Sequence, residues 1–422
     1  MKPRTLGDSL VLRNATKEDI PALLEHFRTV HGEGVIDELR TMLERYPRFS
    51  WEDSFIIAHQ ETGEVVSCTL LLRSSWTLDS IEFPSVEMEA VGTLEAYRYR
   101  GHMRLLNDAF EERAAELQPV IQTIAGIPFF YRIFGYEYAA PLGGGYPVSA
   151  DLVPRLPDGE EEPVTFEEVD EQNYSEFLKY RESHIARKTW NRTWHRTLRP
   201  DSADYLLFEQ SSFEQEAHFF YLVKEQGKTV GSFYIARWEK RADIVELYLD
   251  NYKHLDAVVR LVLARAKEWD GIPVRVVPPN QSQLKEFVVV RTQCLTINRY
   301  AWYIKIPSVI RFIETMAALF EQRLKTTEFN NFDGSLKVTD YKRGYELIFE
   351  KGEFTKVTER EEKNIREYQL MIPKGALTRL LMGYETLDEL MSHEPDVTCV
   401  SAMKPLVRAL FPKLNANVDP YY

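Results

Sequence analysis

The chain has 422 residues, too many for a single ordinary hydrophobic core, so two or three domains are expected. Hydrophobic residues make up 44% of it. No apolar run reaches the roughly 18 residues of a membrane helix, so no membrane partner is expected. The formal net charge of −13 argues against nucleic-acid binding, which normally requires a basic face. The charge suits a cationic substrate, or solubility alone.

The cysteines indicate the compartment. Cys68, Cys294 and Cys399 lie far apart, are odd in number and form no Cys-x-x-Cys pair. This favours a reducing cytoplasm over a disulfide framework or a metal site. The N-terminus also lacks the apolar segment of a secretory signal. We therefore expect a cytoplasmic protein without a metal cofactor.

The first block, residues 1–150, predicts a strand, two helices, a hairpin and then strand–helix–strand. Helix-starting residues follow the first strand, and a turn at Glu61–Glu64 joins the hairpin. The predicted strands are Leu10–Arg13, Phe55–Ala58, Val65–Leu72, Ser85–Thr93 and Val120–Ala125. The predicted helices are Ala22–Val30, Ile36–Glu44 and His102–Leu117.

The second block, residues 151–306, repeats this order. It opens with a Pro-, Gly- and Glu-rich joint that cannot build a core. The predicted strands are Pro163–Phe166, Phe219–Val223, Thr229–Arg237, Asp243–Leu249, Val274–Val277 and Ala301–Ile306. The predicted helices are Asp170–Arg181 and Leu255–Trp269. The repeated order indicates an internal structural duplication without close sequence repetition.

The third block, residues 307–422, changes character. A long amphipathic helix is predicted over Ser308–Leu324, and a helix starting at Pro373 ends at Gly383. The predicted strands are Ser335–Asp340, Tyr345–Glu350 and Glu367–Ile372. The chain closes with an apolar segment at Leu406–Leu410 and a polar tail.

The segment Val91–Arg104 carries the most informative motif. A strand ends, a basic turn with one glycine follows, and an amphipathic helix begins. Backbone N–H groups at a helix N-terminus, aided by the helix dipole, bind pyrophosphate without a metal. Gly101 removes a side chain where the backbone must approach the anion. An ordinary strand–helix turn with solvated arginines is the alternative, whereas the Walker and Gly-x-Gly-x-x-Gly patterns are absent.

The motif and its surroundings resemble the GNAT acetyltransferase superfamily, whose phosphate loop reads Arg/Gln-x-x-Gly-x-Gly/Ala. Tyr131, Gly135 and Tyr136 match that superfamily's Tyr-x-x-x-Gly-Phe/Tyr element. The resemblance implies acetyl-CoA as co-substrate. The residues that it assigns to the cofactor are Val91, Gly92, Thr93, Arg98, Tyr99, Arg100, Gly101, His102, Met103 and Arg104.

The layout of the whole chain resembles the Eis (enhanced intracellular survival) family. Met103 stands where most GNAT members have Gly or Ala, and bulky aliphatic residues are common there in the Eis family. The resemblance implies an α/β (α+β) fold: two tandem GNAT-like mixed-sheet domains, then a sterol-carrier-protein-like α+β domain. It also implies a homo-oligomer, with a hexamer as one form. Specific motif matches are confined to about 91–104 and 129–136.

The resemblance also assigns catalytic roles. The backbone amides of Val91 and Thr93 are expected to hold the thioester carbonyl and the pantetheine arm. Tyr131 is the candidate general acid, because a phenol is protonated at neutral pH and can serve a thiolate leaving group. The carboxylate of Tyr422 is the candidate base, and a tail that merely packs is the alternative. His102 is expected near phosphate or solvent rather than as the base.

The second block lacks the loop: Asn251–His254 joins its strand to the next helix without Arg-x-x-Gly. One active site per chain is therefore expected. The resemblance implies N-acetylation of a small-molecule primary amine, either aminoglycoside-like or polyamine-like. Protein lysines are the alternative acceptors. The alternative class is a non-catalytic acyl-CoA sensor or scaffold, which Met103 would suit.

Overall fold

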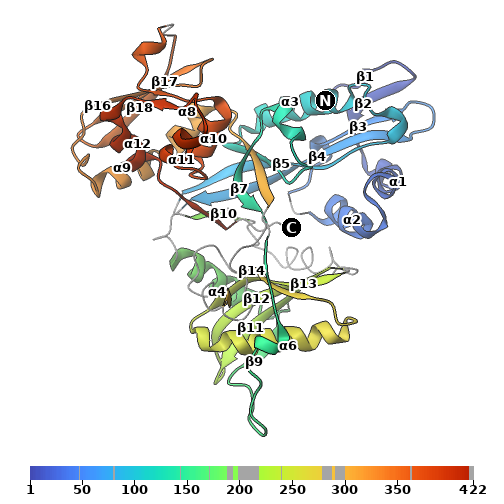
Figure 1. The fold of residues 1–422 in the computed structure, drawn as a ribbon. Helices are drawn as coiled ribbons and strands as arrows, with labels where there is room; N and C mark the ends of the chain where they lie inside the picture. Colours follow the sequence, from blue (N-terminus) through green and yellow to red (C-terminus); the bar gives the residue numbers. More distant parts are fainter. Residues whose placement is uncertain are drawn as a thin grey trace.

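The computed structural model describes the chain except for residues 47, 79–80, 143, 171, 188–192, 198–217, 239, 278–287, 290–299, 362–363 and 418–422. Within these limits the fold is mixed α/β, with one sheet for each of the three blocks (Figure 1). The duplicated layout predicted for the first two blocks is present in their sheets. Among the described helices, none has the length and apolar character needed to cross a membrane.

The first sheet has ten strands, with helices on both faces. On one face α1 packs through Leu23 and Phe27 and α2 through Leu39 and Met42. On the other face α3 packs through Leu106 and Phe110. The strands are β1 (Arg4–Thr5), β2 (Leu10–Asn14), β3 (Ser54–His59), β4 (Val65–Leu78), β5 (Ile81–Thr93), β6 (Ile121–Ile124), β7 (Glu137–Leu142), β10 (Thr193–Thr197), β15 (Tyr300–Lys305) and β21 (Asn415–Asn417). The helices are α1 (Ile20–His31), α2 (Ile36–Arg45) and α3 (His102–Leu117).

The second sheet repeats this layered plan with six strands. Helix α6 packs on one face through Val258 and Val262, and α4 packs on the other through Tyr174 and Phe177. The strands are β8 (Tyr146–Pro147), β9 (Thr165–Glu168), β11 (His218–Glu225), β12 (Lys228–Trp238), β13 (Arg241–Leu249) and β14 (Val274–Val277). The helices are α4 (Tyr174–Arg187) and α6 (Leu255–Glu268).

Among the described strands, four belong to the sheet of another block: β10, β15 and β21 join the first sheet, and β8 joins the second. The strand expected to close the second block, observed as β15, pairs with β6 and β7 of the first sheet. Conversely, β8 from the end of the first block pairs with β14 of the second sheet. Residues 300–305 therefore join the first sheet, although the sequence order groups residues 301–306 with the second block. Local sequence pattern predicts that a segment is a strand, but not which non-local edge it will join.

The third block holds a five-stranded sheet covered by short helices. The strands are β16 (Gly334–Thr339), β17 (Gly344–Glu350), β18 (Glu353–Arg360), β19 (Leu370–Met371) and β20 (Thr398–Cys399). The helices are α8 (Val309–Thr315), α9 (Ala317–Lys325), α10 (Lys374–Leu381), α11 (Leu387–His393) and α12 (Lys404–Leu410). The single long helix predicted over 308–324 is two helices, because the chain departs from helical geometry at Met316.

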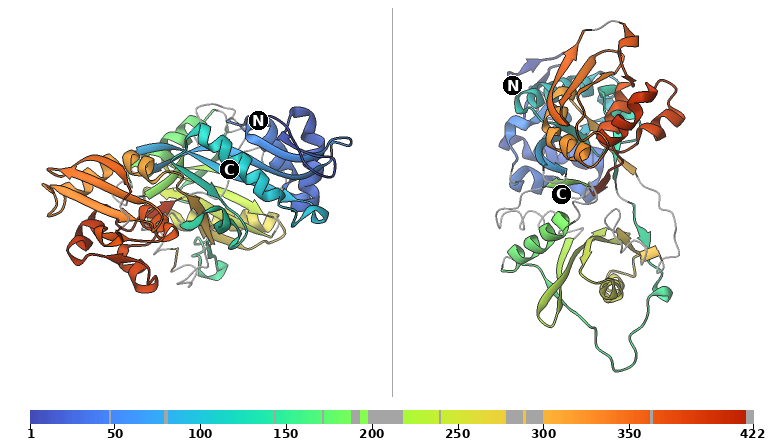
Figure 2. Two further views of the ribbon diagram at one scale, coloured as in Figure 1. Left: turned by 90° about the horizontal axis from the view of Figure 1, so that it is seen from above. Right: turned by 90° about the vertical axis from the view of Figure 1, so that its left-hand side faces the viewer.

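The third block shares a core with the first. Trp76 of β4 and Trp302 of β15 are fully buried in the same apolar cluster as Phe312 of α8. Burying ~200 Å² of aromatic surface at ~25 cal/mol per Å² stabilises the structure by about 5 kcal/mol per tryptophan, as an upper estimate. In Figure 2 the third block accordingly lies alongside the first, and the second block lies apart from it. The third block thus contributes to the packing of the first sheet.

Candidate active site

The site is centred where strands β5 and β6 part. These strands pair in parallel over Ser85–Glu87 and Ile121–Thr123, and the described pairing stops there, although β5 continues to Thr93. A bulge lies beyond that point: Cys68 pairs with Gly92 and Leu70 pairs with Glu89, so two residues of β5 oppose one of β4. Ala90, inside the bulge, has φ of 49°. Bulges re-aim backbone groups beside functional sites, and this one consists of Ala90 and Val91 and lies just before Thr93.

Gly92 and His26 fix the end of β5 from the α1 side. A Cβ on Gly92 would lie 2.6 Å from Nε2 of His26, so only glycine leaves room for the imidazole. The Nδ1 atom of His26 lies 2.9 Å from the carbonyl oxygen of Val65, which makes Nδ1 the protonated nitrogen. Burial lowers the pKa of His26 to about 4, so the ring is neutral at physiological pH. Sequence reasoning missed His26, although a histidine next to the apolar Phe27 in α1 was a visible signal.

The N-terminus of α3 has the geometry of an anion cradle. Its N-cap is Gly101 with φ of 83°, a left-handed conformation that glycine adopts without strain. A Cβ at Gly101 would meet nothing within 4 Å, so the space in front of the helix is open. The first N–H groups of a helix have no intrahelical partner, and a glycine cap supplies no side chain to accept from them. His102 and Met103 therefore present backbone donors toward this space.

The basic residues of the loop are exposed around the cradle. Arg98, Arg100 and Arg104 all lie at the surface, as does Tyr99. The Nε atom of Arg98 donates to the carbonyl of Thr93 at 3.3 Å, which ties the loop to the end of β5. Arg100 lies over the ring of Tyr97, 5.2 Å from its centroid. The structure thus brings the predicted loop residues to one end of the first sheet.

The sequence led us to expect the imidazole of His102 near phosphate or solvent. In the structure the ring does not face solvent. It is buried and stacks on Tyr97 with the ring centroids 6.2 Å apart. Burial and the nearby Arg100 lower its pKa. A neutral, buried ring is a packing element of the loop. Only the backbone of His102 remains available to an anion.

Tyr131 lies in the short 3-10 helix Phe130–Phe134, which follows β6. It is buried, and its hydroxyl makes no hydrogen bond among the described residues. Burial, with the negative charge of Glu89, raises the pKa of Tyr131, so the phenol stays protonated at neutral pH. Its ring lies against Gly126, where a Cβ would come within 2.0 Å of Cε2. Tyr131 is thus a protonated phenol held in a defined position.

Glu89 is a second residue that sequence reasoning missed. It lies directly opposite Leu70, whose side chain packs with α1 and α2. Paired residues of neighbouring strands point to the same face, so Glu89 faces α1 and α2. The alternation of acidic and apolar residues along β5 was the available signal. Glu89 places a carboxylate one residue before the bulge.

Met103 and Tyr422 are two further residues that the sequence assigned to the site. Met103 is half-buried and packs on the apolar cluster of α3 and the first sheet. Tyr422 lies outside the described residues, so its role stays a prediction. Strand β21, the last described element, runs parallel to β10 at the edge of the first sheet. Among the described residues, no group of three His, Cys, Asp or Glu side chains could hold a metal ion.

Comparison with known proteins identifies the chemistry of the first block. Residues 11–139 match the model of the acetyltransferase (GNAT) domain, so the chain carries the enzyme type that its sequence predicts. A comparison with curated proteins gives no match.

The whole fold is similar to several solved structures. A probable N-acyltransferase of Enterococcus faecalis, described as a conserved protein of unknown function, is 13% identical with a TM-score of 0.70, over 98% of this chain and 100% of that one. Eis1 of Mycobacterium abscessus is 14% identical with a TM-score of 0.62, over 97% and 100%. The N-myristoyltransferase of Saccharomyces cerevisiae, solved with bound myristoyl-CoA, is 12% identical with a TM-score of 0.50, over 72% and 82%.

Proposed function

We propose that this protein transfers an acetyl group from acetyl-CoA to a primary amine by direct attack in its first block. The observation that carries the proposal is the meeting of three features at one end of the first sheet. These are the parted strands β5 and β6, the glycine-capped N-terminus of α3, and the buried phenol of Tyr131. The GNAT domain match over residues 11–139 supports the same chemistry.

Each part of the site has a distinct task. The backbone N–H groups of His102 and Met103 bind the pyrophosphate, and Arg98, Arg100 and Arg104 add positive charge. The backbone amides of Val91 and Thr93 hold the thioester carbonyl where negative charge develops. The amine nitrogen attacks the carbonyl carbon, the C–S bond breaks, and Tyr131 gives its proton to the departing thiolate. The attacking nitrogen loses one proton to a carboxylate.

The carboxylate that accepts this proton has two candidates. Tyr422 supplies the first, by resemblance to the Eis family. Glu89 supplies the second, because it lies one residue before the bulge and its charge acts on Tyr131. Removing Tyr422 and, separately, Glu89→Gln distinguish them: the variant that loses the basic group should lose kcat with little change in the KM for acetyl-CoA.

The proposal extends to the family of the enzyme, its acceptor substrate and its assembly. Fold likeness to Eis1 supports an Eis-type enzyme, with a catalytic unit over 1–150, a degenerate GNAT-like unit over 151–306 and a sterol-carrier-like unit over 307–422. We propose an aminoglycoside-like or polyamine-like acceptor and a homo-oligomeric assembly. Light scattering of the purified protein measures the assembly.

A thiol-release assay tests the activity. Acetyl-CoA is offered with kanamycin, spermidine or a lysine peptide, and turnover of at least one amine is expected. Binding of acetyl-CoA without turnover of any amine would favour the sensor or scaffold class. Tyr131→Phe should lower kcat about a hundredfold, because general acid catalysis contributes on that order. Unchanged kcat would remove Tyr131 as the acid.

A further inference from the structure

Three tyrosine hydroxyls lie together behind Tyr131, on strands that the loop motif does not include. Tyr138 belongs to β7, and Tyr300 and Tyr303 belong to β15. The rings of Tyr138 and Tyr303 stack with their centroids 4.1 Å apart, and Tyr303 meets the edge of Tyr131 at 5.7 Å. Tyr138 and Tyr303 occupy paired positions on the two strands.

These hydroxyls bind the backbone of the loop that carries Tyr131. Tyr300 donates to the carbonyl of Gly126 at 2.6 Å. Tyr303 shares its single hydrogen between the carbonyl of Ile127 at 3.2 Å and the hydroxyl of Tyr138 at 2.7 Å. The N–H of Phe129 donates to the hydroxyl of Tyr138 at 3.2 Å. Backbone groups of three loop residues are therefore held by three phenols.

The number of hydroxyl hydrogens decides which group donates in each bond of this network. A phenol has one hydrogen to donate, and that of Tyr300 is directed to Gly126. The 3.0 Å contact between the hydroxyls of Tyr138 and Tyr300 is therefore donated by Tyr138. Burial and the bond to Tyr138 raise the pKa of Tyr303 to about 12, so it remains a donor throughout the physiological range. Each hydroxyl has a separate role, and none duplicates another.

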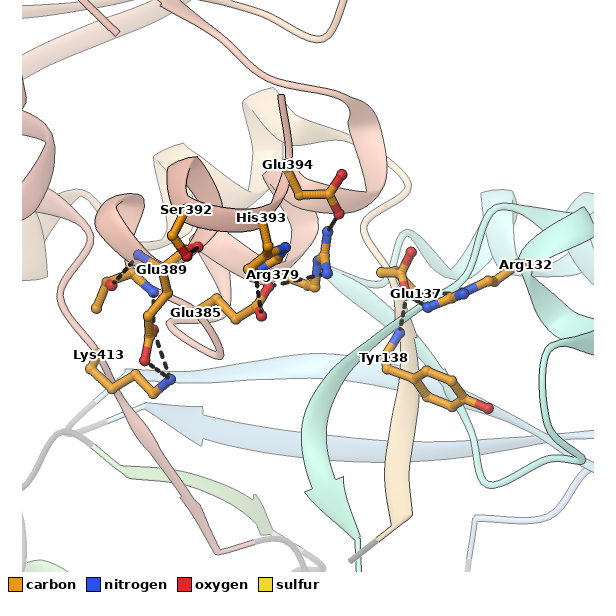
Figure 3. A network of polar contacts seen from close by, with 11 residues as sticks. Arg132, Glu137, Tyr138, Arg379, Glu385, Glu389, Ser392, His393, Glu394 and Lys413 are labelled. Atoms are coloured by element: carbon orange, nitrogen blue, oxygen red, sulfur yellow. Dashed lines mark hydrogen bonds and ion pairs between the residues drawn. The ribbon is translucent and has the colours of Figure 1, made fainter. Parts of the chain in front are cut away.

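The network bears directly on the position of Tyr131. The ring of Tyr131 lies so close to Gly126 that no side chain fits between them, so a shift of Gly126 shifts the ring. Phe129 sits in a strained left-handed conformation with φ of 69°, which the surrounding bonds must hold. An ion pair braces the far side of the segment: Arg132 donates to Glu137 at 2.6 Å, and the N–H of Tyr138 donates to the same carboxylate (Figure 3).

We propose that Tyr138, Tyr300 and Tyr303 are positioning residues that hold Tyr131 at the leaving thiolate. The proposal rests on the proposed role of Tyr131 as the acid. It also explains why β15, which returns from beyond the second sheet, belongs to the first sheet. The first 150 residues alone lack two of the three hydroxyls, so they do not make a complete site.

A double-mutant cycle tests the proposal in the full-length protein. Tyr300→Phe with Tyr303→Phe should lower kcat on the order of tenfold, since small misplacements of a catalytic group cost that much or more. The KM for acetyl-CoA should change less than twofold, because the phosphate loop is untouched. In a Tyr131→Phe background the same pair should cause no further fall, because the network acts only through that phenol. The amine is whichever of kanamycin, spermidine and the lysine peptide turns over fastest.

Tyr341→Phe is the matched control, because its hydroxyl also donates to a backbone carbonyl, that of Asp396 in the third block. It should leave kcat unchanged. Equal falls with and without the Tyr131 hydroxyl would overturn the positioning role while leaving the acid intact. Full activity of Tyr131→Phe would instead overturn the acid itself. Each single variant is measured beside the pair, and Tyr300→Phe alone must lower kcat more than Tyr341→Phe; an equal effect also overturns the network.

Discussion

The ends of β5 and β13 have the same backbone geometry but different side chains around it. In each strand two residues oppose one of the neighbouring strand, and the first of the two has positive φ: Ala90 at 49° and Glu246 at 45°. Each strand has a parallel partner before the bulge, β6 or β14. The second block therefore keeps the strand geometry of the candidate site in the first block, although Asn251–His254 before α6 lacks Arg-x-x-Gly.

Three local changes separate the two ends. The second residue after Ala90 is Gly92, which leaves room for His26, whereas the second after Glu246 is the buried Tyr248. Arg181 forms an ion pair with Glu246 through two guanidinium nitrogens, so the second bulge carries paired charge. Before α6, the side chain of Asn251 accepts the N–H of Lys253 at 3.0 Å and satisfies a donor that an anion would need. The two strand ends therefore share a backbone geometry and differ in the side chains around it.

The largest expected effect comes from blocking the cradle. Gly101→Val adds a β-branched side chain at φ of 83° in the space before α3. Strain and the loss of charge-assisted contacts should together cost about 3 kcal/mol, which raises the KM for acetyl-CoA about a hundredfold. Gly227→Val is the control, because Gly227 has φ of 79° and equally open space in the second block. Equal changes in KM for both variants would contradict a phosphate site at α3.

The contact between Gly92 and His26 gives the next effect. Gly92→Ala places a Cβ within 2.6 Å of the imidazole and should lower the free energy of unfolding by about 2 kcal/mol. With His26→Ala the clash disappears, so the two substitutions should couple by more than about 1 kcal/mol. Gly7→Ala, where a Cβ meets nothing, is the control for urea unfolding. Additive effects would show that the two residues do not constrain each other.

Much of this comparison could be predicted from sequence, and the limits have physical causes. Helix α3 and the loop before it follow from local signals: a strand end, a glycine and apolar residues at helical spacing. The absence of the Arg-x-x-Gly loop before α6 could also be predicted from the sequence. Tyr300 and Tyr303 could not be assigned to the site, because the edge that β15 joins is decided by non-local packing around Trp302. His26 could not be placed either, because its contact with Gly92 depends on how α1 crosses β5.

Acidification tests the buried neutral histidine. Because burial lowers the pKa of His26 to about 4, the unfolded chain binds a proton between pH 6.5 and 4 that the native protein does not. Stability should therefore fall as pH drops through this window, by up to ~1.4 kcal/mol per unit from this group. Above pH 6.5 His26 causes no loss of stability. His26→Gln should reduce the pH dependence of the urea midpoint. An unchanged dependence in His26→Gln would show that His26 is not buried as described.

Met103→Ala should have the smallest effect, and it separates two interpretations of the loop. Met103 is half-buried on α3 and packs against the apolar cluster that contains Leu106 and Phe110, so its side chain stabilises the helix. Its backbone N–H, which the cradle uses, survives the substitution. The KM for acetyl-CoA should thus change less than about twofold, and stability should fall by about 1–2 kcal/mol for a partly buried side chain. If Met103 instead closes the loop to catalysis, as in a sensor, the alanine variant should turn over amines faster than the wild type. The thiol-release assay measures both the KM for acetyl-CoA and the turnover of amines.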